Sequence, residues 1–194
     1  MVVSGMSAGI AAECLAVKRR HKSRLPNLWL LTDQQRCPNP LAAILRLPRH
    51  GRAGVLIRHH LPPDQRSTII RLCHARGIAL VIAGATESGA HLRGGRWHDA
   101  RRPRRGLLTA SAHNQIELQN AMRRHVDLVF LSPAFATSSH PGARPLGSVR
   151  WARLARSIKL PVLALGGIQP RSLRRLGRFC AGAGGIGLFN ATED

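Results

Sequence analysis

Short apolar runs alternate along the chain with polar or glycine-containing turns and with longer stretches whose apolar residues recur at helical spacing. This alternation predicts repeated βα units. Most runs are apolar at successive positions, as expected for parallel strands that have helices on one face and a barrel interior on the other. Eight strands are predicted, at residues 28–32, 54–57, 79–83, 90–92, 107–110, 128–132, 162–165 and 185–189.

Eight strands in 194 residues favour a single (β/α)8 TIM barrel over an open doubly wound sheet. No GxGxxG motif follows the first predicted strand, where such an open sheet would bind a dinucleotide. The sequence ends soon after the last predicted strand, so the last helix is expected to be short or missing. Residues 1–27 are expected to form an N-terminal helical extension, helical over residues 7–20, and residues 28–194 the barrel.

Four helices are predicted between the strands. Asp64 is expected to cap a helix that continues to Arg76 and stops at Gly77. Asn114 is expected to start a second helix, NQIELQNAMRRH, which has an apolar stripe and two arginines near its end. The other two are predicted at residues 149–158 and 170–180.

The net charge of +21, from 30 Lys+Arg against 9 Asp+Glu, raises the question of nucleic-acid binding. The cations recur along the whole chain, and only residues 101–105 form a dense cluster. Aromatic residues make up only 4% of the chain, so few side chains could stack on exposed bases. Composition therefore disfavours a nucleic-acid partner, and a basic nucleic-acid-binding domain is the most remote alternative.

Localisation is expected to be cytoplasmic. No apolar run approaches the roughly 20 residues of a membrane span, and the charges near the N-terminus follow the apolar part, unlike those of a secretory signal. The cysteines are scattered without a CxxC pair, which is typical of free thiols in a reducing compartment: Cys14, Cys37, Cys73 and Cys180. The sequence leaves the oligomeric state open.

Glycines at the ends of the last two predicted strands form the strongest candidate site. Gly166 and Gly167 end the seventh strand, and residues 184–190 accompany the eighth. Glycines at these positions expose backbone N–H groups to an anion, and barrels commonly bind phosphate at these two loops. A phosphorylated small molecule is the expected ligand.

Five segments in one order along the chain carry a family resemblance. They are LLTD at 30–33, VLIR at 55–58, GAHL at 89–92, SPAFATSSHPG at 132–142 and PVLALGGI at 161–168. Together they resemble the thiamine-phosphate synthase/TenI barrels, over roughly residues 28–191. The resemblance implies that the phosphate of a thiazole is held by Gly166, Gly167, Gly187 and the backbone near Asn190, helped by Thr137 and Ser139.

The chain departs from the other half of the family pattern. In the synthases the thiazole attacks a pyrimidine-methyl diphosphate, whose leaving pyrophosphate is handled by magnesium and basic residues. Here the expected metal carboxylates are replaced by Ala83, Gly84 and Arg96, so no cofactor is established and magnesium is doubtful. The resemblance is thus to a divergent member of the family, one that lacks the usual metal ligands.

Two interpretations of this departure remain open. Arg58, Arg93 and Arg96 could replace the ion and bind pyrophosphate directly, since arginine grips phosphate bidentately. Coupling of the thiazole to the pyrimidine would then persist. Alternatively, the pyrimidine half is abandoned and the barrel acts on thiazole phosphate alone, as the TenI-type thiazole tautomerases do, or only binds a phosphate.

Histidines are the candidate proton carriers. His113, at the end of the fifth strand, stands where the tautomerases have a histidine that moves a proton on the ring. It could equally serve only to cap the following helix. Because residues at alternate positions of a strand share a face, His60 is expected to face the ligand as Arg58 does. His140, in the loop SSHPG, is expected to contact phosphate. Zinc is not expected, because the adjacent His59 and His60 point to opposite faces of a strand.

Overall fold

The computed structural model describes residues 9–14, 16, 25–83, 90–91, 107–137 and 142–186. Its strands are β1 Leu28–Leu31, β2 Ala53–Ile57, β3 Ala79–Ile82, β4 Ala90–His91, β5 Thr109–Ala112, β6 Leu128–Leu131, β7 Val162–Ala164 and β8 Cys180–Gly185. Its helices are α2 Leu41–Arg46, α3 Pro63–Ala75, α4 Gln115–Arg123, α5 Gly147–Arg156 and α6 Pro170–Arg174, with a 3-10 turn η1 at Gly177–Phe179. Residues 9–14 are also helical.

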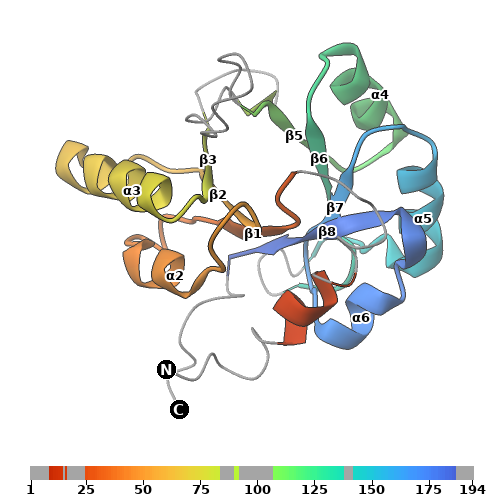
Figure 1. Cartoon of the computed structure of the whole chain (residues 1–194). Helices are drawn as coiled ribbons and strands as arrows, with labels where there is room; N and C mark the ends of the chain where they lie inside the picture. Colours follow the sequence, from red (N-terminus) through yellow and green to blue (C-terminus); the bar gives the residue numbers. More distant parts are fainter. Residues whose placement is uncertain are drawn as a thin grey trace.

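The strands form one sheet in the order β3-β2-β1-β8-β7-β6-β5-β4. Every neighbouring pair is parallel except β4 and β5. The sheet curves into a half-barrel. Helices α2 and α3 lie outside its β1–β3 part, and α4, α5 and α6 lie outside its other part (Figure 1). The parallel strands therefore end along one edge, which we call the C-terminal edge.

The inner face of the half-barrel is packed with large apolar side chains. Trp29 and Phe130 meet edge to face there, with ring centroids 5.4 Å apart. Gly54 makes room for this packing, because a Cβ at that position would lie 2.7 Å from the indole ring of Trp29. Leu56 and Val81 belong to the same cluster, so alternate residues of β2 and β3 point inward.

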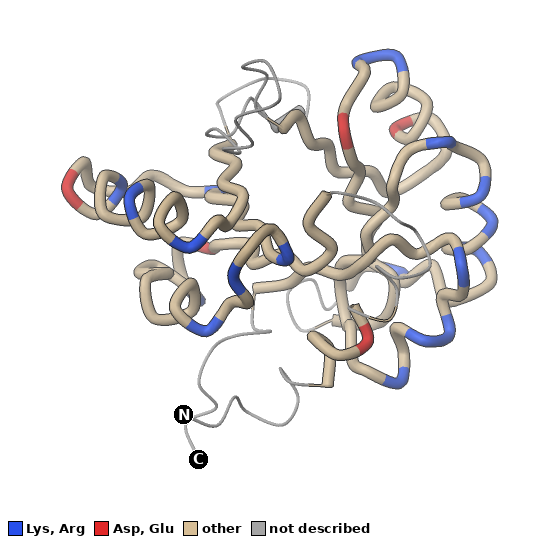
Figure 2. The backbone as a smooth tube through the Cα atoms, viewed as in Figure 1, with Lys and Arg blue, Asp and Glu red and all other residues tan. Residues whose placement is uncertain are grey.

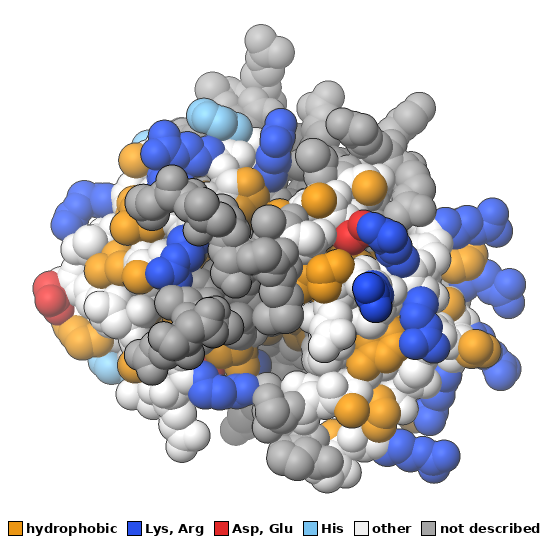
Figure 3. Space-filling view, turned by 90° about the horizontal axis from the view of Figure 1, so that it is seen from below, with side chains coloured by type: hydrophobic (Ala, Val, Ile, Leu, Met, Phe, Trp, Pro, Cys, Tyr) orange, Lys and Arg blue, Asp and Glu red, His pale blue; other side chains and the backbone are white. Residues whose placement is uncertain are grey.

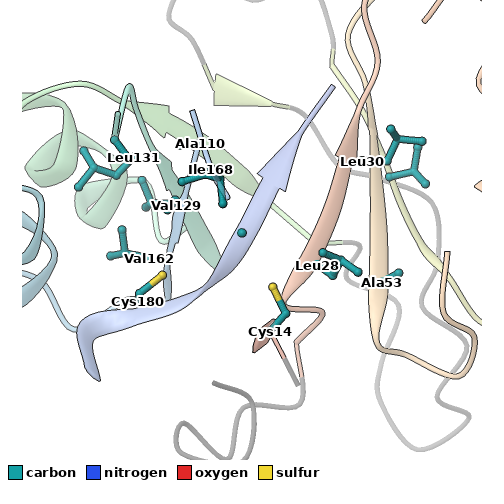
Figure 4. Packing of buried hydrophobic residues seen from close by; sticks show 14 of the residues in the cluster. Cys14, Leu28, Leu30, Ala53, Ala110, Val129, Leu131, Val162, Ile168 and Cys180 are labelled. Atoms are coloured by element: carbon teal, nitrogen blue, oxygen red, sulfur yellow. The ribbon is translucent and has the colours of Figure 1, made fainter. Parts of the chain in front are cut away.

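A second apolar layer fills the space between the strands and the helices. Leu28, Leu30, Val129 and Val162 belong to it, and each is almost completely buried (Figure 4). Trp151 of α5 is anchored in this layer, where its indole Nε1 donates to Leu131 O at 3.1 Å. Two packed layers on either side of one sheet explain why the predicted strands are apolar at successive positions.

The N-terminal helical segment packs in the outer apolar layer, near the start of β1 and beside α6. Ile10 and Cys14 are buried in the outer layer, and the side chain of Asn27 donates to Cys14 O. Glu13 accepts from Arg174 Nε at 2.7 Å. Part of the predicted helix over residues 7–20 is thus helical and in contact with the sheet.

Most of the predicted elements are confirmed. Strands β1, β2, β3, β6 and β7 and helices α3 and α5 lie within two residues of the predicted bounds. The side chain of Asn114 caps α4 by accepting from Glu117 N at 3.0 Å. The fifth strand lies two residues later than predicted, and the six-residue helix α2 was not predicted.

The expected parallel fourth strand is wrong, because β4 runs antiparallel to β5. The connection from β3 to β4, residues 83–89, is shorter than the roughly 12 residues that a parallel crossover needs. Within the described part of the chain no pairing joins β3 to β4. The structure thus has an α/β half-barrel of seven parallel strands, and closure into a full barrel is not established.

The bounds predicted for the eighth strand and the preceding helix are also wrong. Helix α6 ends at Arg174, and Cys180, expected to end that helix, begins β8. The strand consists of the small residues CAGAGG. Close packing explains this composition, since a Cβ on Gly182 would lie 2.7 Å from the carbonyl carbon of Asn27. The predicted strand at residues 185–189 was placed on the more apolar residues that follow.

Basic residues are distributed along many elements (Figure 2). The face in Figure 3 likewise carries lysine and arginine side chains at many separate places. All four cysteines are buried free thiols, and burial raises the pKa of Cys14 and Cys73 to about 12. Among the described residues, no helix has the length and apolar character needed to span a bilayer.

Candidate functional site

The loops that follow β6 and β7 are joined to each other at the C-terminal edge. Ala134 N donates to Leu165 O at 2.7 Å, and Phe135 N donates to Gly166 O at 3.1 Å. These bonds extend the β6–β7 pairing beyond the strands themselves. The β6 loop is held from its other side as well, because Gly147 N at the start of α5 donates to Ala134 O.

Gly166 and Gly167 are required by this close approach of the two loops. Both have positive φ, +84° and +61°. A Cβ on Gly166 would lie 3.0 Å from Pro133 Cβ, and one on Gly167 would lie 2.9 Å from Phe135 Cβ and overlap Ala136 O. The predicted turn is therefore present, and it packs against the β6 loop just before the half-buried Thr137.

The backbone N–H groups of this turn are available to a ligand. No residue that the structure describes accepts a hydrogen bond from the N–H of Gly166 or Gly167. Successive unpaired N–H groups at a glycine turn form a common binding site for anions. The geometry thus suits a phosphate group at the ends of β6 and β7.

The ends of β1 and β2 form a second cluster, built from side chains. Arg58 Nε donates to Thr32 O at 3.0 Å, and Thr32 Oγ1 accepts from Arg58 N at 3.0 Å and contacts His59 Nδ1 at 3.0 Å. Arg58 Nη2 lies 3.7 Å from Asp33 Oδ2. Burial lowers the pKa of Arg58, and the Asp33 carboxylate opposes this effect, so the guanidinium remains charged.

Asp33 is itself held by neighbouring donors. Its Oδ1 accepts from the backbone N–H of Gln35 and of Arg36, each at 3.1 Å, and Arg36 Nη2 lies 3.4 Å from Oδ2. The backbone hydrogen bond from Arg36 holds the pKa of Asp33 below its usual value, although burial opposes the shift. Asp33 therefore serves here to position a turn and Arg58.

His113 follows β5 and contacts Glu117 of the next helix, α4. Its Nδ1 lies 2.9 Å from Glu117 Oε2, which also accepts from His113 N at 2.9 Å, and Asn114 Nδ2 donates to Glu117 Oε1 at 2.6 Å. Burial would raise the pKa of Glu117, but the hydrogen bonds from His113 and Asn114 lower it overall. A charged Glu117 only accepts, so Nδ1 carries the proton and Nε2 is left as the basic nitrogen.

The described residues do not fit a magnesium ion. Magnesium prefers oxygen ligands, yet Ala83 follows β3, and the carboxylate at the end of β1 belongs to Asp33, which is held by arginines. No group of three or more His, Cys, Asp or Glu that could hold a metal occurs in the described ranges.

Several predicted site residues are not brought together with these clusters. His60 is exposed, three residues beyond β2, and lines a pocket with Arg66 of α3. Gly184 and Gly185 are strand residues of β8 and form no turn. The remaining candidates lie outside the described residues: Gly84, Arg93, Arg96, Ser139, His140, Gly187 and Asn190.

Three residues that contribute to the geometry were not among the predicted site residues: Thr32, Asp33 and Glu117. The LLTD motif at the end of β1 pointed to Thr32 and Asp33, since polar residues directly after a parallel strand lie at the C-terminal edge. Glu117 follows the cap Asn114 by three residues, which is the spacing of a capping box.

Comparison with known proteins identifies relatives. Residues 63–191 match the family model described as thiamine monophosphate synthase. The chain is 36% identical over 87 residues to the thiamine-phosphate synthase of Lysinibacillus sphaericus, which is 44% of this chain and 40% of that protein. It is 35% identical over 86 residues to that of Chloroflexus aurantiacus, 44% of this chain and 39% of that protein. The matched segments thus span less than half the length of each of these relatives.

A solved structure shares the fold. It is a thiamine phosphate pyrophosphorylase from Pyrococcus furiosus, with a TM-score of 0.63 and 17% identity. The superposition covers 89% of this chain and 91% of that one.

Proposed function

Because the chain belongs to the thiamine monophosphate synthase family, we propose that it binds a thiazole phosphate and couples it to a pyrimidine diphosphate to give thiamine phosphate. The observation that carries this proposal is the glycine turn after β7. Its two unpaired N–H groups offer donors to a phosphate at the edge where α/β barrels bind their ligands, and Thr137 is proposed to contact the same group. Ser139, Gly187 and Asn190 are proposed to complete the phosphate site.

In the proposed reaction the thiazole nitrogen donates its electron pair to the methylene carbon of the pyrimidine. A C–N bond forms while the C–O bond to the diphosphate breaks, and pyrophosphate leaves with that electron pair. Arg58, already fixed by Thr32 and Asp33, is proposed to stabilise the departing charge together with Arg93 and Arg96. His60 and His140 are proposed to contact the diphosphate or phosphate oxygens.

The test is a pyrophosphate-release assay with purified protein, thiazole phosphate and pyrimidine diphosphate. Release above a protein-free blank is expected. Thr137→Val should raise the KM for thiazole phosphate about tenfold by removing one hydrogen bond to a charged group. Thr68→Val, a matched change on α3 away from the site, should leave the KM unchanged. Release no faster than the blank would overturn the proposal.

The contact between His113 and Glu117 favours a second activity, tautomerisation of the thiazole phosphate ring. His113 Nε2 would accept a proton from one ring atom and return one at another, so that no atom is gained or lost. Glu117 would hold the imidazole in the required tautomer. His113→Ala should abolish tautomerisation, followed by NMR, while His74→Ala should not. Retained activity in His113→Ala would reject this role.

The remaining proposals concern the fold of the whole chain, its location in the cell and its partners. We propose that residues 28–194 close into a (β/α)8 barrel, with residues 1–27 as an extension, and that the protein works in the cytoplasm on small phosphorylated partners. If neither reaction occurs but thiazole phosphate still raises Tm, the chain is a phosphate-binding barrel without catalysis.

A further inference from the structure

A pocket of about 430 Å³ lies between α3 and the ends of β2 and β3. It is on the helix side of the sheet. Ile57 and Leu80, which line it, belong to the outer apolar layer, whereas their chain neighbours Leu56 and Val81 belong to the inner one. The pocket is therefore separate from the glycine turn after β7, at which the thiazole phosphate is proposed to bind.

The connection that follows β3 is short. In an α/β barrel, a helix between successive strands covers the outer face of the sheet. Residues 83–89, between β3 and β4, are fewer than a helical crossover requires. Among the described residues, α3 is the helix that lines the pocket.

The floor of the pocket is apolar. Ile57, Ile69 and Leu80 line it and are each at most 5% exposed, while Ile82 is half-buried. At its border stands Ile70 of α3, which is 44% exposed although it is large and hydrophobic. Such a surface favours an apolar body, and a volume of this size is typical of small-molecule sites.

The rim of the pocket is basic. Arg58, His60 and Arg66 line it, and the lining contains no aspartate or glutamate. Neither His60 nor Arg66 makes a side-chain hydrogen bond to a residue that the structure describes. Arg58 is engaged by Thr32 and Asp33, so Arg66 is the cation most available to an incoming anion.

We propose that this pocket binds a free small molecule with an apolar body and a single anionic head, at a site distinct from that of the thiazole phosphate. The apolar body packs on Ile57, Ile69, Ile70 and Leu80, and the head pairs with Arg66. Charge complementarity and the apolar floor together select this class, because an inorganic anion would leave the floor empty and a cationic amphiphile would meet the arginines.

Titration calorimetry with octyl phosphate, below its critical micelle concentration, tests the proposal. Saturable binding to the full chain is expected, with no binding of octyltrimethylammonium and no competition from inorganic phosphate at the same concentration. Arg66→Gln and Ile70→Asn should each weaken binding about tenfold or more. Both side chains are exposed, so the variants are expected to fold, which circular dichroism checks.

Matched controls come from neighbouring exposed positions. Arg71→Gln on α3 and Leu45→Asn on α2 remove the same chemistry outside the pocket and should leave the affinity unchanged. Equal affinity in all four variants, absence of binding, or binding only to anionic vesicles would overturn the proposal.

A competition experiment separates this site from the proposed function. Saturating thiazole phosphate should leave octyl phosphate binding unchanged. Displacement of octyl phosphate would place both at one site and overturn the inference. Failure of thiazole phosphate to bind at all would count against the proposed function alone, because the octyl phosphate titration and its variants need no thiazole.

Discussion

The loops after β6 and β7 are joined by backbone hydrogen bonds, whereas the ends of β1 and β2 are joined by side chains. On the first side, Ala134 N and Phe135 N bind the carbonyls of Leu165 and Gly166. On the second side, Arg58 reaches across to Thr32 and Asp33. Both clusters occupy the same edge of one sheet.

This difference means that the two halves of the proposed site should respond differently to substitution. The glycine turn after β7 depends on small residues and on close packing, so most substitutions within it disturb the fold. A side-chain cluster can lose its metal carboxylates and retain its strands. The proposed phosphate-binding half is thus tied to stability, and the proposed diphosphate-binding half is tied to individual side chains.

The largest expected effect is that of Gly167→Ala. The new Cβ would overlap Ala136 O at a residue with φ of +61°, so either the turn or the β6 loop must move. We expect the free energy of unfolding, measured by urea denaturation, to fall by roughly 3 kcal/mol or more.

Gly177→Ala is the matched control. Gly177 also has positive φ, +70°, but a Cβ there would meet nothing within 4 Å. Only the backbone conformation is penalised, so a loss of about 1 kcal/mol is expected. Equal losses in the two variants would show that the packing of the two loops does not distinguish Gly167.

Arg58→Gln probes the side-chain half. It removes the charge that Thr32 and Asp33 position at the end of β2, so the rate of pyrophosphate release should fall roughly tenfold to hundredfold. The affinity for thiazole phosphate, measured by calorimetry, should be unchanged because the proposed site for that ligand lies after β7.

Two further variants control this prediction. Arg52→Gln, at an exposed position just before β2, should have no effect on release. Arg58→Lys should recover little activity, since lysine cannot reproduce both the Nε contact and the contact to Asp33. A loss of thiazole phosphate affinity in Arg58→Gln would mean that the two halves are not separate.

The smallest effect concerns pH and Glu117. Its pKa is lowered in the folded protein, so its carboxylate contributes stability above the pKa of the unfolded chain, and that contribution is lost as the pH falls through the lowered pKa. Glu117→Gln should show a weaker fall of unfolding free energy as the pH falls. Since the side chain is 39% exposed, the difference should stay below about 1 kcal/mol. Identical pH profiles would mean that the His113 contact contributes nothing.

Local patterns were sufficient to predict most of the fold. The start of α4 was predictable because three local features indicate the same position. These are the amide oxygen of Asn114, Glu117 three residues later, and the apolar stripe that follows. The strands β1, β2 and β6 are apolar on both faces because both layers of the core bury them. Such signals are contained within a few neighbouring residues.

The errors arose where distant residues decide the structure. Gly182 lies in a strand because it packs against Asn27, which is remote in the sequence. The direction of β4 depends on how many residues connect it to β3, here residues 83–89. The apolar residues from which the strand was predicted carry no information about direction. Likewise, only the structure shows that Arg58 is held at the end of β2 by contacts with Thr32 and Asp33.

The magnesium dependence of pyrophosphate release tests the central claim most directly, namely that the phosphate half of the site persists while the metal half is lost. Release would be measured with thiazole phosphate and pyrimidine diphosphate, first with added magnesium and then with excess chelator. The predicted result is the same rate under both conditions, because no carboxylate set for the ion occurs among the described residues. A rate that falls tenfold or more on chelation would contradict it.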